Sequence, residues 1–167
     1  MSEVTVFLDV DGVLSPVAPP RNDHWDDWER IEGIPFHLVL SRQMAARIAD
    51  LGAEIIWLTT WEHDANAVVA DYLGWEPHEV LERKDSTGQW WKFEALAERI
   101  ESDPRPFAWI DDELERRKRD VGPWLRDRDV PVLALSPRSE IGLTPGEITR
   151  LEDFVAEHAG GAVHGAG

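Results

Sequence analysis

The chain has 167 residues, 43% hydrophobic and 30% charged, which is the size and composition of a soluble globular protein with one compact core. Its 17 Lys and Arg against 33 Asp and Glu give a formal net charge of −16, which disfavours non-specific binding to nucleic acids and to anionic membranes. The absence of Cys excludes disulfides, thiolate metal sites and cysteine nucleophiles, and with no apolar run long enough for a membrane span or a leader we expect a cytoplasmic protein.

The first third of the chain predicts a buried strand, an irregular segment and a helix. Residues 4–10 are mostly β-branched and apolar, as in a strand of a parallel sheet, and the run ends in an acidic turn at Gly12. Residues 15–40 are rich in Pro, Asp and Trp, and we expect them to form a flap with one short strand at 35–40. Ser41 is the expected N-cap of a helix that ends near Leu51.

The rest of the chain alternates between predicted strands and helices. We expect strands at 53–59, 80–81, 107–110 and 130–135, and helices at 63–73, 90–100, 112–125 and 144–158. The last helix opens with Thr144 and Glu147, a capping-box spacing. This alternation predicts an α/β fold with an open, mostly parallel, Rossmann-like sheet flanked by helices. We expect a single domain over residues 1–159 and a disordered tail over 160–167.

Polar residues follow the predicted strands where ligands usually bind. In an open parallel sheet the carboxyl ends of the strands share one crevice. Several carboxylates in one crevice require a bound cation or raised pKa values, and ligands that are all oxygen favour a hard divalent ion such as Mg²⁺. The residues expected in this crevice are Asp9, Asp11, Thr59, Thr60, Lys92, Asp111 and Asp112.

Four motifs, in chain order, resemble those of the haloacid-dehalogenase (HAD) superfamily. Residues 7–14 (FLDVDGVL) are similar to the first motif, a strand followed by D-x-D-G-[VT]-L, and residues 58–60 (LTT) to the second. Lys92 corresponds to the third motif and residues 109–112 (WIDD) to the acidic fourth. Residues 57–66 and 142–144 further resemble small HAD domains found in RNA-repair proteins. The spacing between motifs leaves room for the flap but not for a cap domain, so the resemblance is to the capless type.

The resemblance implies a Mg²⁺-dependent phosphatase that acts on a phosphate monoester. Asp9 would be the nucleophile and form an aspartyl-phosphate, and Asp11 would act as general acid and then as general base. Asp111 and Asp112 would hold Mg²⁺ together with the Asp9 carboxylate and the carbonyl of Asp11. Gly12 would allow a sharp turn and offer its N–H to the phosphate.

Two further phosphate-binding positions each have a competing neighbour. The family role of the second motif falls to Thr59, with Thr60 adjacent to it. The family role of the third motif falls to Lys92, with Lys84 as an alternative. Both hydroxyl and ammonium groups would stabilise the charge on the transferring phosphoryl group.

The sequence does not decide the substrate, and it allows two alternative functions. HAD enzymes without a cap often accept large phosphorylated substrates, and Trp25, Trp28 and Trp61 either stack on a substrate ring or pack the flap. A receiver-like module needs its acceptor Asp after the third strand, whereas here the D-x-D-G motif follows the first. The other alternative is a phosphate-binding, metal-binding or protein-interaction domain on a HAD scaffold with little hydrolytic activity.

Overall fold

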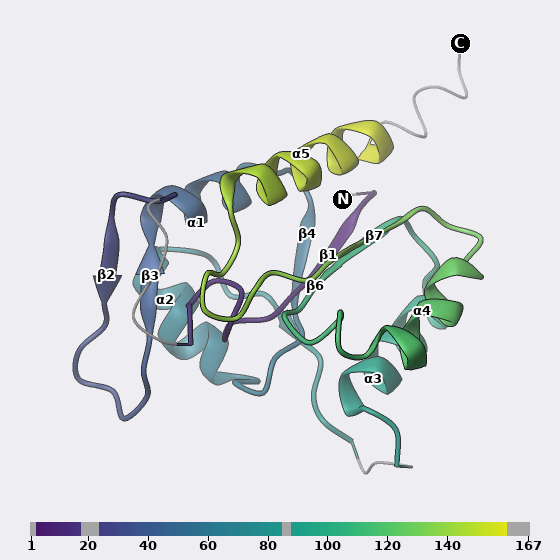
Figure 1. Ribbon diagram of the computed structural model, residues 1–167, viewed down its shortest axis with the longest axis horizontal. Helices are drawn as coiled ribbons and strands as arrows, with labels where there is room; N and C mark the ends of the chain where they lie inside the picture. Colours follow the sequence, from purple (N-terminus) through teal and green to yellow (C-terminus); the bar gives the residue numbers. More distant parts are fainter. Residues whose placement is uncertain (1–2, 18–23, 85–87, 160–167) are drawn as a thin grey trace.

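A five-stranded parallel sheet forms the centre of the protein in the computed structural model, which describes residues 3–17, 24–84 and 88–159 (Figure 1). The strand order is β5-β4-β1-β6-β7, and every neighbouring pair is parallel. The strands are β1 (Thr5–Leu8), β4 (Glu54–Trp57), β5 (Glu79–Val80), β6 (Phe107–Ile110) and β7 (Val132–Leu135). The predicted open α/β sheet is therefore confirmed.

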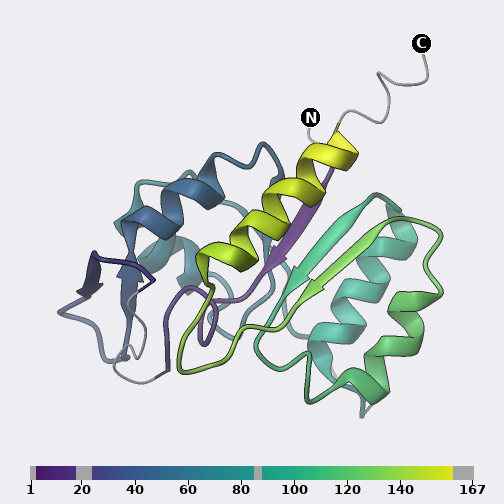
Figure 2. The same cartoon turned by 45° about the horizontal axis from the view of Figure 1, so that its top comes forward.

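Helices cover both faces of this sheet, because the side chains of each strand alternate between two apolar clusters. On β1, Val6 and Leu8 belong to one cluster and Phe7 to the other. The first cluster is closed by α1 (Arg42–Ala49), η1 (Ala65–Ala70) and α5 (Pro145–Ala159). The second is closed by α3 (Trp91–Ser102) and α4 (Lys118–Arg126), which lie side by side in Figure 2. Within the described residues, no helix has both the length and the apolar character that a membrane crossing requires.

Two predicted helix starts are confirmed by their capping bonds. The Ser41 hydroxyl accepts a hydrogen bond from the Met44 N–H at 3.1 Å, at the start of α1. At the start of α5, the Glu147 carboxylate accepts from the Thr144 N–H at 3.0 Å, and the Thr144 hydroxyl accepts from the Glu147 N–H at 3.2 Å. This reciprocal pair is a capping box.

The segment between β1 and α1 forms a small antiparallel hairpin rather than a cap domain. It pairs β2 (Trp28–Arg30) with β3 (Val39–Ser41) and lies at the edge of the molecule beside α1 (Figure 1). We predicted one strand at 35–40 and not its partner. Trp25 is buried and donates through its indole N–H to the carbonyl of Leu143, so it packs the flap against the body. No separate cap is present among the described residues.

Two helices differ from the predicted ones. The helix expected at 63–73 is a π-helix, η1, followed by the short α2 (Asp71–Leu73). In η1 the Asn66 side chain binds the backbone N–H and C=O of His78 and the indole N–H of Trp57. The helix expected from residue 112 begins only at Lys118, after a series of turns. The predicted tail over 160–167 lies outside the described residues.

Candidate functional site

The ends of three adjacent strands bring the predicted polar residues together. In the parallel ladders, Leu8 of β1 is opposite both Trp57 of β4 and Ile110 of β6. The residues that follow these strands therefore leave the sheet at one edge. Asp9 and Asp111 are the first residues after β1 and β6, and both are buried. The strand ends therefore bring Asp9 and Asp111 to the same edge of the sheet.

Lys92 lies between the two buried carboxylates. Its ammonium nitrogen is 3.1 Å from Asp9 Oδ2 and 2.7 Å from Asp111 Oδ2. All three side chains are almost wholly shielded from solvent: Lys92 is 3% exposed, Asp9 5% and Asp111 0%. Lys92 occupies the first turn of α3, whose N-terminus faces this edge of the sheet. Lys84, the alternative to Lys92, instead pairs with Glu98 at 2.8 Å on the exposed surface.

One lysine does not fully compensate the buried carboxylates. Burial, followed by the neighbouring Asp111 carboxylate, raises the pKa of Asp9 to about 8, against the opposing effect of Lys92. Burial also raises the pKa of Asp111 above its usual range. Burial alone would lower the pKa of Lys92, but the two carboxylates outweigh it and raise that pKa. The ionised forms of these carboxyl groups are therefore disfavoured unless a further cation compensates them.

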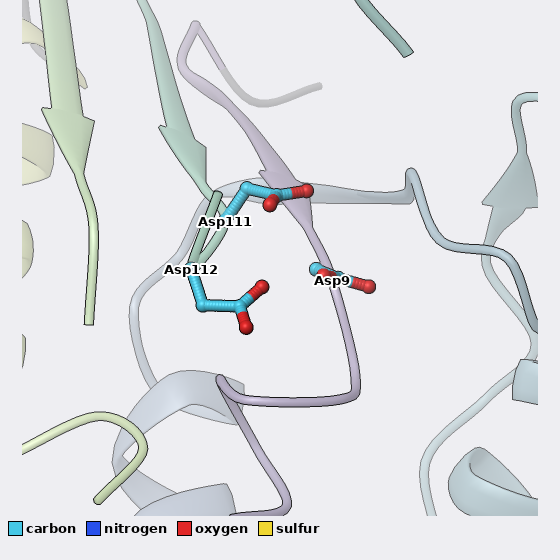
Figure 3. A group of neighbouring side chains, drawn as sticks. All are labelled: Asp9, Asp111 and Asp112. Atoms are coloured by element: carbon cyan, nitrogen blue, oxygen red, sulfur yellow. The ribbon is translucent and has the colours of Figure 1, made fainter. Parts of the chain in front are cut away.

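Three carboxylates converge in a geometry suited to a metal ion. Asp9, Asp111 and Asp112 each offer an oxygen, and these oxygens lie within 4.8 Å of one another (Figure 3). A set of hard oxygen ligands matches the preference of Mg²⁺. The Ser139 hydroxyl donates to Asp112 Oδ2 at 2.6 Å, and the Glu113 N–H donates to Asp111 Oδ1 at 2.9 Å. These bonds hold the carboxylates of Asp112 and Asp111 in position.

Gly12 brings the turn after β1 close to the carboxylate cluster. Its backbone has φ +76°, and a Cβ at this position would lie 2.2 Å from Asp112 Oδ2. Only glycine combines this conformation with this approach. We predicted that the Gly12 N–H would face a phosphate, but it donates to the carbonyl of Ser15 at 2.7 Å. The missing side chain of Gly12 is therefore what permits the close approach to Asp112, and phosphate binding by its N–H stays a prediction.

Asp11 lies on the solvent side of the site and is held by Trp61. The Trp61 indole N–H donates to Asp11 Oδ2 at 3.1 Å. Burial raises the pKa of Asp11 above its usual range, and the bond from Trp61 opposes that shift. Asp11 also lines a cavity of about 580 Å³ whose wall includes Phe36, His37 and Trp61.

The two adjacent threonines differ in their surroundings. Thr59 is fully buried at the end of β4, and its hydroxyl oxygen accepts from the Trp61 N–H at 3.2 Å. Thr60 is exposed and lines the cavity beside Asp11. Thr59 thus lies in the buried region where the strands end, while Thr60 lines the open cavity.

Three residues at the site were not predicted from the sequence. Ser139 follows the last strand by four residues, so the rule that selected Asp9 and Asp111 points to this loop as well. Trp61 was considered for ring stacking or packing, but its bond to Asp11 joins residues 50 positions apart and no spacing reveals it. Phe36, which is 54% exposed in the flap, has no motif around it.

Comparison with protein families agrees with this geometry. Residues 5–147 match the family model described as the HAD domain in Swiss Army Knife RNA repair proteins. The matched region includes the whole site, from Asp9 to Ser139. No curated protein and no solved structure matches the chain.

Proposed function

The chain belongs to the family of HAD domains found in Swiss Army Knife RNA repair proteins, and from this premise we propose that it is a Mg²⁺-dependent phosphohydrolase of phosphate monoesters. The observation that supports this most strongly is the buried cluster at the strand ends. Asp9, Asp111 and Asp112 present oxygens within 4.8 Å of one another, and Lys92 contacts the first two. A buried surplus of carboxylates is costly for a protein unless the site binds cations.

In the proposed reaction, Asp9 is the nucleophile. A carboxylate oxygen of Asp9 attacks the phosphorus, and the bond from phosphorus to the leaving oxygen breaks. Asp11 donates its proton to that leaving oxygen and then accepts a proton from the water that hydrolyses the aspartyl-phosphate. Lys92 and the Thr59 hydroxyl stabilise charge on the transferring group. Thr60 and Lys84 are weaker candidates for these roles because both are exposed, and Lys84 is paired with Glu98.

The metal would be held by the same carboxylates. Asp9, Asp111 and Asp112 would bind Mg²⁺, with the backbone carbonyl of Asp11 completing the protein ligands. When bound, Mg²⁺ supplies charge stabilisation of several kcal/mol at the phosphoryl oxygens and screens the phosphate from the Asp9 carboxylate. The bonds from Ser139 to Asp112 and from the Glu113 N–H to Asp111 orient these ligands.

The proposed substrate is a phosphorylated molecule that reaches the site without passing a cap. The described flap is a hairpin and leaves the cavity beside Asp11 open. This arrangement suits a large substrate or one that bears a ring. The family description names RNA repair, which is consistent with a phosphorylated end as substrate, whereas the net charge of −16 opposes non-specific binding to long polyanions.

A phosphate-release assay with active-site variants tests the proposal. We expect the wild type to release phosphate from a panel of monoesters only when Mg²⁺ is present. Asp9→Asn should abolish release and Asp11→Asn should reduce it strongly, while Lys84→Met should leave it unchanged. A wild type that is inactive across the panel would instead support the alternative, a binding or interaction domain. Full activity in Asp9→Asn would show that the nucleophile is wrongly assigned.

A further inference from the structure

The cavity beside Asp11 offers a place for the leaving group of the proposed reaction. Asp9 is 4% exposed and lines no part of the open cavity, whereas Asp11 is half-buried and forms part of its wall. A phosphoryl group bound to Asp9 must direct its leaving oxygen away from the attacking oxygen, because displacement at phosphorus is in line. The proposed proton donor to that oxygen is Asp11, so the leaving group would extend into the cavity of about 580 Å³ beside Asp11.

Trp61 connects this cavity to Asp11. Its indole N–H donates to Asp11 Oδ2 at 3.1 Å, while its ring is part of the cavity wall. Because Oδ2 accepts this bond, Oδ1 is the oxygen that can carry a transferable proton toward the leaving group. A neutral indole N–H can donate but cannot accept, so the oxygen that it contacts is not the one that carries the proton.

The backbone around Trp61 is held in place independently of Asp11. The Trp61 N–H donates to the buried Thr59 hydroxyl oxygen at 3.2 Å. The next residue, Glu62, has φ +48°, a left-handed conformation that is costly for a residue with a side chain. The Glu62 carboxylate in turn accepts from the Arg83 N–H at 3.0 Å. These contacts fix the backbone from which the Trp61 indole reaches Asp11.

The rest of the cavity wall favours a flat ring without negative charge. Phe36 meets the Trp61 ring edge-on with 5.3 Å between centroids, yet is 54% exposed, so a large apolar surface faces the cavity mouth. Asp64 lines the same cavity, and its carboxylate disfavours a second anionic group. An aromatic ring inserted here would contact the Trp61 and Phe36 rings. Because the inserted ring carries no charge, the Asp64 carboxylate would not repel it.

We propose that Trp61 is a positioning residue for Asp11, and that Trp61 and Phe36 form a leaving-group subsite for alcohols that carry a flat, non-anionic ring. The inference rests on the proposed function, since it requires Asp11 to protonate the leaving oxygen. In that step the P–O bond breaks, its electron pair stays on the leaving oxygen, and the proton from Asp11 Oδ1 completes the alcohol.

A leaving-group series tests the positioning role. p-Nitrophenyl phosphate has a leaving group that needs little protonation, whereas 2-phenylethyl phosphate has an alkoxide that needs a proton. Trp61→Phe keeps a ring in the wall and removes the N–H. The readout is kcat/KM, which reports only the steps up to formation of the aspartyl-phosphate and not its later hydrolysis. We expect kcat/KM for 2-phenylethyl phosphate to fall about tenfold, and kcat/KM for p-nitrophenyl phosphate to change by less than about twofold.

Trp28→Phe is the matched control for this series. Trp28 lies in the flap hairpin, and its indole nitrogen has no hydrogen-bond partner within the part of the chain that the structure describes. The same chemical change at Trp28 should alter kcat/KM for neither substrate. An equal loss on both substrates in Trp61→Phe, or the same substrate-dependent loss in Trp28→Phe, would overturn the positioning role.

A second variant tests the ring subsite separately. Phe36→Ala should raise KM for 2-phenylethyl phosphate about fivefold and leave KM for ethyl phosphate unchanged. Equal KM changes for the two alkyl substrates, or none, would overturn the subsite. If the wild type cleaves these esters and needs Asp9 but the Trp61 and Phe36 effects are missing, only this inference fails. If the wild type cleaves none of them with Mg²⁺, the proposed function fails first.

Discussion

Replacing Asp9 by Asn should make the metal-free protein more stable while removing its proposed nucleophile. Asp9 is buried, and burial together with Asp111 raises its pKa from 3.8 to about 8. In the unfolded chain this carboxyl is ionised above pH 4, whereas in the folded protein it keeps its proton up to about pH 8. Asn is close in shape to the protonated carboxyl and has no charge to lose.

The magnitude follows from the linkage between protonation and folding. Because the folded pKa lies above the unfolded one, the contribution of Asp9 to stability is present below about pH 4 and is lost as the pH rises toward 8. The slope is about −1.4 kcal/mol per pH unit in this window. The wild type should therefore be less stable than Asp9→Asn by roughly 4 kcal/mol at pH 7 and by roughly 2 kcal/mol at pH 5.

Urea unfolding of both proteins in EDTA, at pH 5 and at pH 7, measures this difference. Added Mg²⁺ should stabilise the wild type more than the variant, because the ion binds the ionised carboxylate. A variant that is less stable than the wild type would refute the reasoning. So would a stability gap that does not change with pH, since the gap would then come from packing and not from the ionisation of Asp9.

Three further substitutions test other parts of the site. Gly12→Ala should weaken Mg²⁺ binding at least tenfold, as measured by calorimetry, because the alanine Cβ would displace the Asp112 carboxylate. An unchanged affinity for Mg²⁺ would contradict the close approach of Gly12 to Asp112. Lys92→Met should lower kcat about a hundredfold, because its ammonium group contacts Asp9 and Asp111. Lys84→Met is the control and should leave kcat unchanged. Equal effects of the two substitutions would contradict the assignment of Lys92. Ser139→Ala should weaken Mg²⁺ binding about tenfold with little change in thermal stability, and a loss of stability alone would show a purely structural role.

The parts of the fold that the sequence predicted depend on local signals. A run of apolar β-branched residues ending at Asp9 is enough to predict a buried strand, and the strand-end rule then places Asp111 beside it. The caps at Ser41 and Thr144 were also predictable, because each involves residues only three positions apart.

The parts that the sequence did not predict depend on contacts between distant residues. The β2–β3 pairing is held by Asp27, which accepts from the Ser41 hydroxyl and from the Gln43 N–H in the next helix. The π-helix η1 contains Asn66, whose side chain is bonded to the loop at His78 twelve positions away. Apolar periodicity carries no information about either contact.

The site shows the same division. The buried positions of Asp9 and Asp111 follow from the strands, but the bond from Trp61 to Asp11 and the bond from Ser139 to Asp112 do not. These bonds depend on how loops fold over the sheet edge. The sequence also does not reveal that the turn folds back on itself, so that the Gly12 N–H donates to the Ser15 carbonyl.

Trapping the phosphoryl-enzyme tests the central claim most directly. Asp11→Asn should still form the aspartyl-phosphate from p-nitrophenyl phosphate with Mg²⁺, but should hydrolyse it slowly because the general base is missing. Peptide mass spectrometry after acid quenching should then find one phosphoryl group on Asp9, and none in the protein that also carries Asp9→Asn. A phosphoryl group on another residue, or phosphate release with Asp9 never modified, would contradict the account.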